Sequence, residues 1–405
     1  MRKERKPVNI DKTRLEPLFR EAFEKAVEIR RDLHMHPELS SKEVRTSARI
    51  KEILESFGIE NRSELGNHGL IGTVYGKDRQ HAIGIRADFD ALPVTEEADV
   101  PWKSLEPGRM HACGHDMHTA ALLGTALVLK KYSDMGGELP MSVRFLFEPE
   151  EETTGGARAM IANGAMADPE VTKVFAYHVN PHFEYGKFHF TRGVTNATEV
   201  DFKITIKGRS CHGAHPEMGI DPIPAGCALV TSLQTVVSRR LAPTNTGLIT
   251  IGAFNAGTIS NVIPETCTLL GTIRALDMDT RDLMINAVDR MVRNTASAYG
   301  CTGVFDYQPT DPVLINDDSV LDTIRSVASE LVGESNVDVS YGADMSSDDF
   351  AVFSSMVPGC YFNIGSTIPG SPEVYDIHHP KFQPDERVLD MAIRTEVLSA
   401  LKLME

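Results

Sequence analysis

Two hydrophobic patterns alternate along the first half of the chain. Apolar residues recur at helical spacing within residues 13–58, which predicts helix with a break near His36-Pro37 and an end at Gly58. Thr119–Lys131 predicts a second, more apolar helix. Short apolar runs predict strands at Gly69–Tyr75, Ala82–Arg86, Ser142–Phe147 and Val174–His178. This alternation of strand and helix predicts an α/β fold with a mostly parallel central sheet.

The pattern changes after Arg192. The next segments predict a strand, a helix, two strands, a helix and a strand: Glu199–Lys207, Pro222–Ser238, Gly247–Phe254, Thr266–Ala275, Arg281–Ala298 and Val304–Gln308. The order β-α-β-β-α-β is typical of a compact α+β unit of ferredoxin-like type. After Pro309 the first pattern resumes, with predicted helices and strands at Val320–Leu331, Asp338–Ser340, Phe350–Ser354 and Cys360–Ile364.

The length of 405 residues also indicates two domains, because a single hydrophobic core rarely grows that large. We therefore expect a discontinuous catalytic domain formed by residues 1–191 and 309–405, with a smaller domain inserted at 192–308. Hydrophobic residues make up 41% and charged residues 24% of the chain, the balance of a globular protein.

Charge and cysteine content narrow the classes of function. The net charge of −16 argues against nucleic acid or an anionic membrane as a partner. We see no signal-peptide pattern and no apolar run long enough to span a membrane. The six cysteines are scattered rather than arranged as a disulfide framework, so we expect a reduced, cytoplasmic protein.

The segment His111-Ala-Cys-Gly-His-Asp-Met-His118 has the highest density of candidate chemistry. It directly precedes the predicted helix Thr119–Lys131, and the helix N-terminus favours a thiolate on Cys113. Cys113 and His115 can bind one metal ion if Gly114 lets the backbone turn sharply. A buried structural cysteine with capping histidines is the alternative interpretation.

Three further segments carry potential ligands. Phe147-Glu-Pro-Glu-Glu-Glu-Thr-Thr-Gly-Gly156 places glutamates directly after a predicted strand, where α/β sheets bind ligands, although such a run can also be a solvated turn. A histidine ends the strand in Ala176-Tyr-His-Val-Asn-Pro181, and two more lie in Ile377-His-His-Pro-Lys-Phe382. One cysteine, one glutamate and three histidines at one sheet edge are enough for two metal ions if one ligand bridges them.

Taken together, these segments resemble the M20 metallopeptidases, specifically the amidohydrolase branch that contains hippurate hydrolase, N-acyl amino acid amidohydrolases and auxin-conjugate hydrolases. The resemblance covers nearly the whole chain. It also includes the segments Arg31–Glu38, Ile85–Pro93, Lys207–Pro216, Asn261–Pro264, Gly271–Arg274 and Asp348–Phe350. It implies a metal-dependent exopeptidase-like catalytic domain with an inserted domain that serves as lid and dimerisation surface.

The resemblance also implies roles for individual residues. Five match the metal ligands of the family, with Cys113 as the bridging ligand: Cys113, His115, Glu152, His178 and His378. Glu151 matches the catalytic base, and His212 matches a histidine that reaches the neighbouring subunit's active site in related dimers. Asn261 and Arg274 match positions that contact substrate. The resemblance therefore also implies a homodimer or a higher homo-oligomer.

Some positions depart from the family pattern. The usual Gln-Pro-Ala-Glu-Glu is Glu148-Pro-Glu-Glu-Glu152 here, the usual Gly-Gly-His becomes Ser210-Cys-His212, and the usual Glu-Asp-Phe becomes Asp348-Asp-Phe350. None of these changes removes a ligand or the base. Asp88 and Asp90, at the end of a predicted strand, either orient ligands or stabilise a turn.

The function expected is metal-dependent hydrolysis of the amide bond of a small N-acyl amino acid, releasing a carboxylic acid and an amino acid. The two divalent ions can be zinc, manganese, cobalt or nickel. A metallo-dipeptidase or carboxypeptidase of the same superfamily is an alternative enzyme. A non-catalytic ligand-binding protein that retains the fold is an alternative from another class, and the intact Glu151 argues against it.

Overall fold

The computed structural model describes residues 12–308 and 311–405. The expected domain boundary at 309 therefore lies outside the described residues. The chain divides into two compact units. Unit 1 comprises Met1–Thr195, Ile315–Gly342 and Asp348–Glu405, and unit 2 comprises Asn196–Leu314 and Ala343–Ser347. The short segment 343–347, which belongs to unit 2, was not expected from the sequence.

Unit 1 contains an eight-stranded sheet of order β1-β2-β4-β3-β5-β16-β6-β15. The strands are β1 (Glu60–Arg62), β2 (Leu70–Val74), β3 (Asp78–Asp88), β4 (Met141–Glu148), β5 (Glu170–Glu184), β6 (Phe188–Phe190), β15 (Val337–Asp338) and β16 (Gly359–Thr367). The central pairs β4–β3, β3–β5 and β5–β16 are parallel, whereas β2 and β6 each pair antiparallel with a neighbour. The predicted α/β class with a mostly parallel sheet is confirmed.

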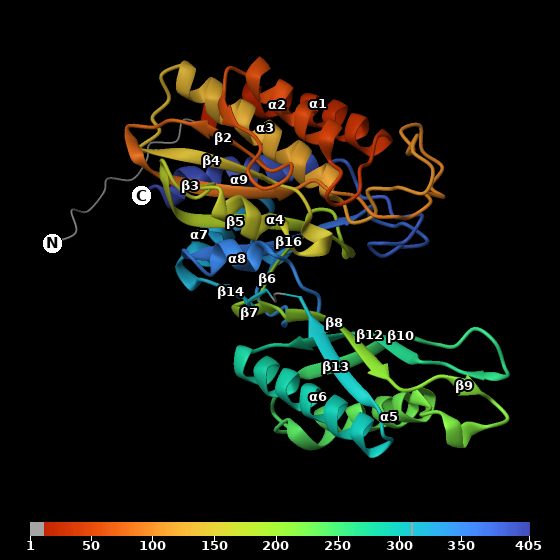
Figure 1. Cartoon of the computed structure of the whole chain (residues 1–405). Coiled ribbons are helices and arrows are strands. Elements are labelled where there is room, and N and C mark those ends of the chain that lie inside the picture. Colours follow the sequence, from red (N-terminus) through yellow and green to blue (C-terminus); the bar gives the residue numbers. More distant parts are fainter. Residues whose placement is uncertain (1–11, 309–310) are drawn as a thin grey trace. The chain divides into compact units, whose positions relative to one another are not determined.

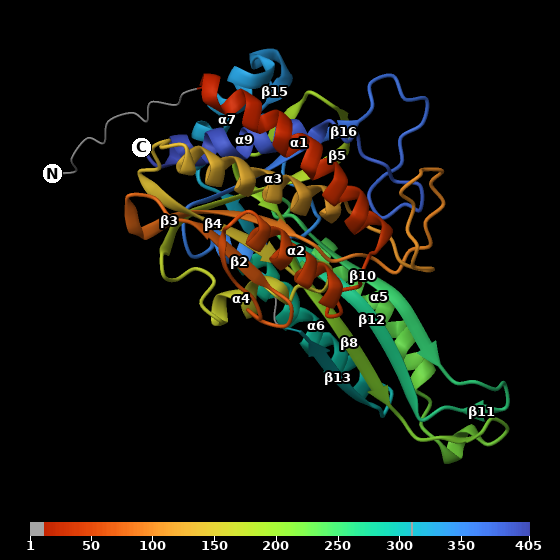
Figure 2. The ribbon, with the colours of Figure 1, turned by 90° about the horizontal axis from the view of Figure 1, so that it is seen from above.

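Helices cover the sheet of unit 1. They are α1 (Lys12–Met35), α2 (Val44–Ser56), α3 (His115–Asp134), α4 (Gly156–Ala162), α7 (Asp318–Val332), α8 (Phe350–Ser354) and α9 (Val388–Leu403), with short 3₁₀ turns at η1 (Glu151–Thr153) and η3 (Glu334–Asn336). Helices α1, α3 and α9 lie side by side and contact one another (Figures 1 and 2). Helix α3 is buried along almost its entire length, which explains why its sequence is apolar on all sides.

Unit 2 has the predicted β-α-β-β-α-β order. Its elements are β8 (Thr198–Lys207), β9 (Cys211–His212), η2 (Pro216–Met218), α5 (Pro222–Arg240), β10 (Gly247–Ala256), β11 (Val262–Ile263), β12 (Thr266–Ala275), α6 (Met278–Ala298) and β13 (Thr302–Tyr307). The four long strands form an antiparallel sheet of order β10-β12-β8-β13, and α5 and α6 pack on one face of it (Figure 1). Two further strands, β7 (Gly193–Asn196) and β14 (Leu314–Asn316), consist mostly of residues of unit 1 and pair with each other.

Two features differ from the expectation. Helix α9 was not predicted, because nearly all of its residues are buried and it lacks a polar face. Strand β5 is much longer than Val174–His178, because it continues past the sheet core to Glu184. No helix among the described residues is long and apolar enough to span a bilayer.

A buried acid on α9 generates a prediction about pH. Burial raises the pKa of Glu396 to about 8, although a hydrogen bond of 2.5 Å from the Thr125 hydroxyl partly offsets this. An acid whose folded pKa is raised binds more protons when folded, so stability falls as pH rises from about 4.5 to about 8. Glu396→Gln, which mimics the neutral acid, should therefore gain stability over wild type as pH rises through this range. Chemical denaturation at pH 5 and pH 8.5 measures this, and parallel stability–pH curves would contradict it.

Candidate metal centre

The candidate ligands gather where strands β3 and β4 end and where β5 passes beside them. Asp88 ends β3, and Glu151 and Glu152 lie in η1, which begins three residues after the end of β4. His178 lies on β5, and its partner in the adjacent β16 is Asn363. Parallel strands point their carboxyl ends toward the same edge, and this is the edge where open α/β sheets bind ligands.

Gly114 makes the turn that brings the first two candidate ligands together. It has a φ of 95°, and a Cβ at this position would lie only 2.4 Å from Cγ2 of Val179. Only glycine fits such a backbone comfortably. Cys113 therefore sits just before α3 while His115 begins it, and the predicted sharp turn at Gly114 is confirmed.

The Cys113 sulfur lies between two histidines that are distant in sequence. Its Sγ is 3.4 Å from Nε2 of His178 and 3.3 Å from Nε2 of His378. The ligand atoms of Cys113, His115 and His178 all lie within 4.8 Å of one another. The same is true of Cys113, Glu152 and His378. The two groups share only the sulfur, an arrangement suited to two cations with one bridging ligand.

Hydrogen bonds fix the orientation of the imidazole rings. Nδ1 of His115 faces the Asp90 backbone oxygen at 3.0 Å and Oδ1 at 3.1 Å, and Nδ1 of His178 faces the Val179 oxygen at 2.7 Å. Each ring then donates from Nδ1 and presents Nε2 to the site, as metal-binding histidines do. Among the described residues, Nε2 of His115 and Oε1 of Glu152 are buried without a hydrogen-bond partner. Metal coordination would satisfy both atoms, so the residues fit metal ions.

Asp90 connects two of the candidate ligands. Its Oδ1 holds His115, and its Oδ2 accepts the backbone N–H of Glu152 at 3.1 Å. Oδ2 also accepts the Ser40 hydroxyl at 2.7 Å. Asp90 is 1% exposed, so these contacts are formed away from solvent. One carboxylate thus positions a histidine at the start of α3 and a glutamate in η1.

Glu151 lies beside this group and also faces two further acids. Its Oε2 is 3.9 Å from Nε2 of His115. Carboxylate oxygens of Glu151, Asp348 and Asp349 all lie within 4.8 Å of one another. Burial, followed by the charges of Asp348 and Glu152, raises the pKa of Glu151 well above its usual range. A carboxylate in such surroundings takes up a proton readily.

The guanidinium of Arg86 balances the acids behind Glu151. Arg86 is fully buried and forms ion pairs with Asp88 at 2.6 Å and with both Asp348 and Asp349 at 3.2 Å. It also pairs with Glu148. Buried charges are tolerated only when they are paired in this way. This fixed cation keeps the acid cluster together.

The charge state of Cys113 differs from the sequence expectation. Without metal, burial and the nearby Glu152 and Glu151 carboxylates raise the pKa of Cys113 well above its ordinary value. The interpretation that the helix N-terminus favours a thiolate is therefore wrong for the metal-free protein, because desolvation and negative neighbours outweigh the helix. Bound divalent cations deprotonate thiol ligands, so the thiolate depends on metal.

The remaining predicted residues lie in unit 2. His212 is exposed on β9 and pairs with Val262 of β11. The backbone oxygen of Asn261 accepts the Gly213 N–H at 2.7 Å, so Asn261 and His212 are neighbours. Arg274 lies on β12 and forms an ion pair of 2.5 Å with Glu199. The roles expected for these three residues stay predictions.

Sequence reasoning missed Arg86 and left the roles of Asp88 and Asp90 open. A signal was present, because charged residues occupy positions 86, 88 and 90, in alternation with the apolar residues at positions 85, 87 and 89. Alternate residues of a strand share one face. All three charged residues are buried: Arg86 and Asp88 lie on one face of β3, and Asp90 follows just past its end, so none of them belongs to a solvated turn.

Comparisons with known proteins agree with this geometry. The family model described as Peptidase family M20/M25/M40 matches residues 84–401. The chain is 34% identical over 383 residues to hippurate hydrolase of Campylobacter jejuni, covering 95% of this chain and 97% of the relative. It is also 34% identical over 381 residues to thermostable carboxypeptidase 2 of Saccharolobus solfataricus, covering 93% and 94%. A crystal structure of a dinuclear metal-binding M20 peptidase from Bacillus subtilis has a TM-score of 0.78 at 32% identity, covering 95% of this chain and 99% of that one.

The position of Asp90 generates a prediction about metal affinity. Asp90→Asn cannot accept hydrogen bonds from both His115 and the Glu152 backbone as the carboxylate does, so metal affinity should fall about 10- to 100-fold. Ser40→Ala, which removes only the third contact of Asp90, is the matched control and should have a smaller effect. Isothermal titration with Zn²⁺ measures both variants. Wild-type affinity in Asp90→Asn would show that the carboxylate does not position the ligands.

Proposed function

This chain is a hydrolase of peptidase family M20/M25/M40, and we propose that it cleaves the amide bond of small N-acyl amino acids or related conjugates, releasing a carboxylic acid and an amino acid. One observation carries the proposal: a buried cysteine is shared by two groups of potential ligands, and a further carboxylate, Glu151, stands beside them. Hippurate hydrolase, one of the relatives, is named for an N-acylated glycine.

We assign five residues as ligands of two divalent ions, with Cys113 shared: Cys113, His115, Glu152, His178 and His378. When bound, such ions supply an acidified water and polarise a substrate carbonyl. Thiolate, imidazole and carboxylate ligands suit zinc, and manganese, cobalt and nickel are chemically reasonable with the same set. The match to a dinuclear metal-binding peptidase supports the number of ions but not their identity.

Glu151 serves as the general base in this proposal. It takes a proton from the water that attacks the amide carbon, and a C–O bond forms. When the C–N bond breaks, Glu151 returns that proton to the leaving amine nitrogen. Burial and the neighbouring acids, which raise the pKa of Glu151, make it able to hold the proton between these steps.

Unit 2 supplies the remaining roles. The Ala214 N–H lies 3.0 Å from Nδ1 of His212, so this nitrogen accepts and Nε2 carries the ring's N–H donor. We propose that this donor stabilises the oxyanion in the neighbouring subunit of a homodimer or higher homo-oligomer, and that Asn261 and Arg274 contact substrate. Unit 2 would then act as lid and dimerisation surface. Six free cysteines are consistent with the cytoplasmic location that we propose.

A peptidase acting on unacylated substrates is the second candidate. The relative named thermostable carboxypeptidase 2, with 34% identity, favours it. The cysteine in the ligand set resembles the amidohydrolase branch instead, and we therefore rank amide hydrolysis of N-acyl amino acids first. A non-catalytic binding protein would have no need of Glu151.

Replacing the base tests the proposal directly. Glu151→Gln should lower kcat about 10²- to 10⁴-fold on N-acetyl and N-benzoyl amino acids while still binding two metal ions. The reason is that Gln cannot accept the proton, whereas the ligand set is untouched. Metal content and turnover, measured on the same preparation reloaded with each divalent ion, give the two quantities.

Two controls sharpen this experiment. Glu152→Gln, one residue away, should lose metal affinity as well as activity. Dipeptides with the same C-terminal residue, assayed in parallel, should be poorer substrates than the N-acyl amino acids. Wild-type turnover in Glu151→Gln would remove Glu151 as the base, and faster hydrolysis of dipeptides with every metal would favour the peptidase.

The proposed dimer gives a complementation test. His212→Ala and Glu151→Gln should each be nearly inactive as homodimers. If His212 acts in the partner's site, a mixed dimer contains one intact site, so an equal mixture that exchanges subunits should recover about a quarter of wild-type activity. If His212 acts within its own chain, the mixture recovers nothing, and the proposal of a shared site fails.

A further inference from the structure

A buried cluster of charged residues, two of them on α1, contacts the segments that follow His115 and His378. Arg30 and His34 are 0% and 1% exposed. Arg30 forms an ion pair of 2.8 Å with Asp116, the residue after His115. His34 lies between two carboxylates, with Nδ1 at 2.8 Å from Asp116 and Nε2 at 3.1 Å from Glu96. The proposed mechanism uses none of these residues.

The cluster also holds the segment that follows His378. The Gln383 amide donates to Glu96 at 3.2 Å, so it shares the Glu96 Oε1 atom with His34. Three residues later, Glu386 binds Arg31 through two hydrogen bonds of 2.6 and 2.9 Å. Glu386 also accepts from Arg30 at 3.3 Å. Residues 378–386 are therefore tied to α1 directly at Glu386 and, through Glu96, at Gln383.

His378 needs such support more than the other ligands. Its side chain is 50% exposed, whereas the side chains of His115 and Glu152 are 1% and 12% exposed. Its φ of 66° is unusual for a residue with a side chain, and such a backbone persists only where its surroundings hold it. The ligand comes from a loop rather than from a helix or strand of the sheet.

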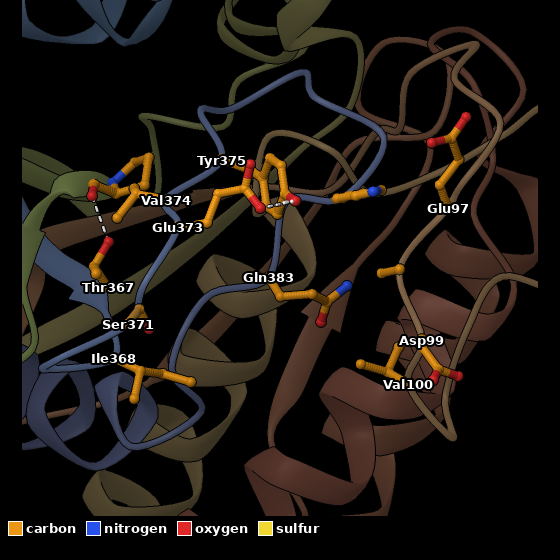
Figure 3. A pocket seen from close by; sticks show the side chains of 13 residues that line it. Glu97, Asp99, Val100, Thr367, Ile368, Ser371, Glu373, Val374, Tyr375 and Gln383 are labelled. Atoms are coloured by element: carbon orange, nitrogen blue, oxygen red, sulfur yellow. Dashed lines mark hydrogen bonds between the residues drawn. The ribbon is translucent and has the colours of Figure 1, made fainter.

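The outer side of this loop is not closely packed. A hollow of about 390 Å³ lies between residues 97–100 and the loop 367–383, and Gln383 and Tyr375 border it (Figure 3). Two backbone hydrogen bonds hold the loop, from the His378 N–H to the Ala112 oxygen at 2.7 Å and from the Glu97 N–H to the Pro380 oxygen at 2.8 Å, and buried Phe382 anchors it in the core. The links from Gln383 and Glu386 to the cluster add side-chain contacts to the segment after His378.

We propose that the cluster of Arg30, Arg31, His34, Glu96 and Asp116 is a positioning device for the second metal site, holding His378 against Cys113 and Glu152 through Gln383 and Glu386. Its links to Gln383 and Glu386 set the metal affinity of the group Cys113–Glu152–His378 and leave that of Cys113–His115–His178 nearly unchanged, because these two links hold the segment of His378 alone. The inference rests on the ligand assignment proposed above, because it gives His378 to only one of the two sites.

The variant Glu386→Gln tests this without disturbing the buried core, because the Glu386 side chain is 18% exposed. Isothermal titration of the metal-free full chain with Zn²⁺ should show two binding steps in wild type. In Glu386→Gln one step should weaken about 10-fold, the size usual for loss of an outer-sphere partner, while the other changes less than about 2-fold. Glu16→Gln is the matched control, since it breaks a surface pair of 2.8 Å between α1 and Arg394 of α9 and should leave both steps unchanged.

Trp102, the single tryptophan, gives a second readout. Its ring lies 4.0 Å from the Arg31 guanidinium carbon, so its emission should change during the Zn²⁺ step that fills the Cys113–Glu152–His378 group, and this change should be lost in Glu386→Gln. His378→Ala should abolish the same Zn²⁺ step. This variant therefore tests the ligand assignment separately from the positioning proposal. Suppose that wild type shows two steps and that His378→Ala removes one of them. If Glu386→Gln then behaves like Glu16→Gln, or weakens both steps equally, the positioning proposal is wrong and the ligand assignment stands. If His378→Ala removes neither step, the ligand assignment itself fails.

Discussion

The Sγ atom of Cys113 lies 3.4 Å from Nε2 of His178 and 3.3 Å from Nε2 of His378, and both groups of candidate ligands include it. The position of this one atom is set by Gly114, whose positive φ lets the chain enter α3 directly above Val179. A larger residue at Gly114 would move the sulfur and the start of α3 together. Both ligand groups would then be lost at once.

Several carboxylates are buried around the Cys113 sulfur, more than a buried environment usually tolerates without positive charges to pair with them. Arg86 balances the acids next to Glu151, and Arg30 balances Asp116 on the other side of α3. Each guanidinium is almost fully buried and pairs with carboxylates from several segments. Because an unpaired buried charge is costly, these pairs tie distant segments into fixed positions as well as neutralising them. Rigid placement of ligands is what a two-metal hydrolase needs.

Individual helices and site residues show how much of this structure the sequence pattern predicts. Helix α2 was predictable, since its apolar residues follow the helical repeat and its end is marked by Gly58. Helix α9 was not, because burial on nearly all sides removes the repeat that reveals a helix. In the site, the motif around Cys113 and the glutamates after β4 stood out as local sequence features. Arg86 did not, because an arginine within a strand is ordinary until its carboxylate partners, up to 263 residues away, are known.

The sequence by itself determined the class of the fold, the β-α-β-β-α-β order of unit 2 and the set of residue types able to bind metal. These follow from spacing within short segments, which the order of residues specifies directly. The tertiary structure alone decided that Cys113 is common to both ligand groups, that Asp90 orients His115 and Glu152, and that the metal-free thiol has a raised pKa. These properties depend on distances through space between residues as far apart as Cys113 and His378, and on burial, neither of which any local pattern contains.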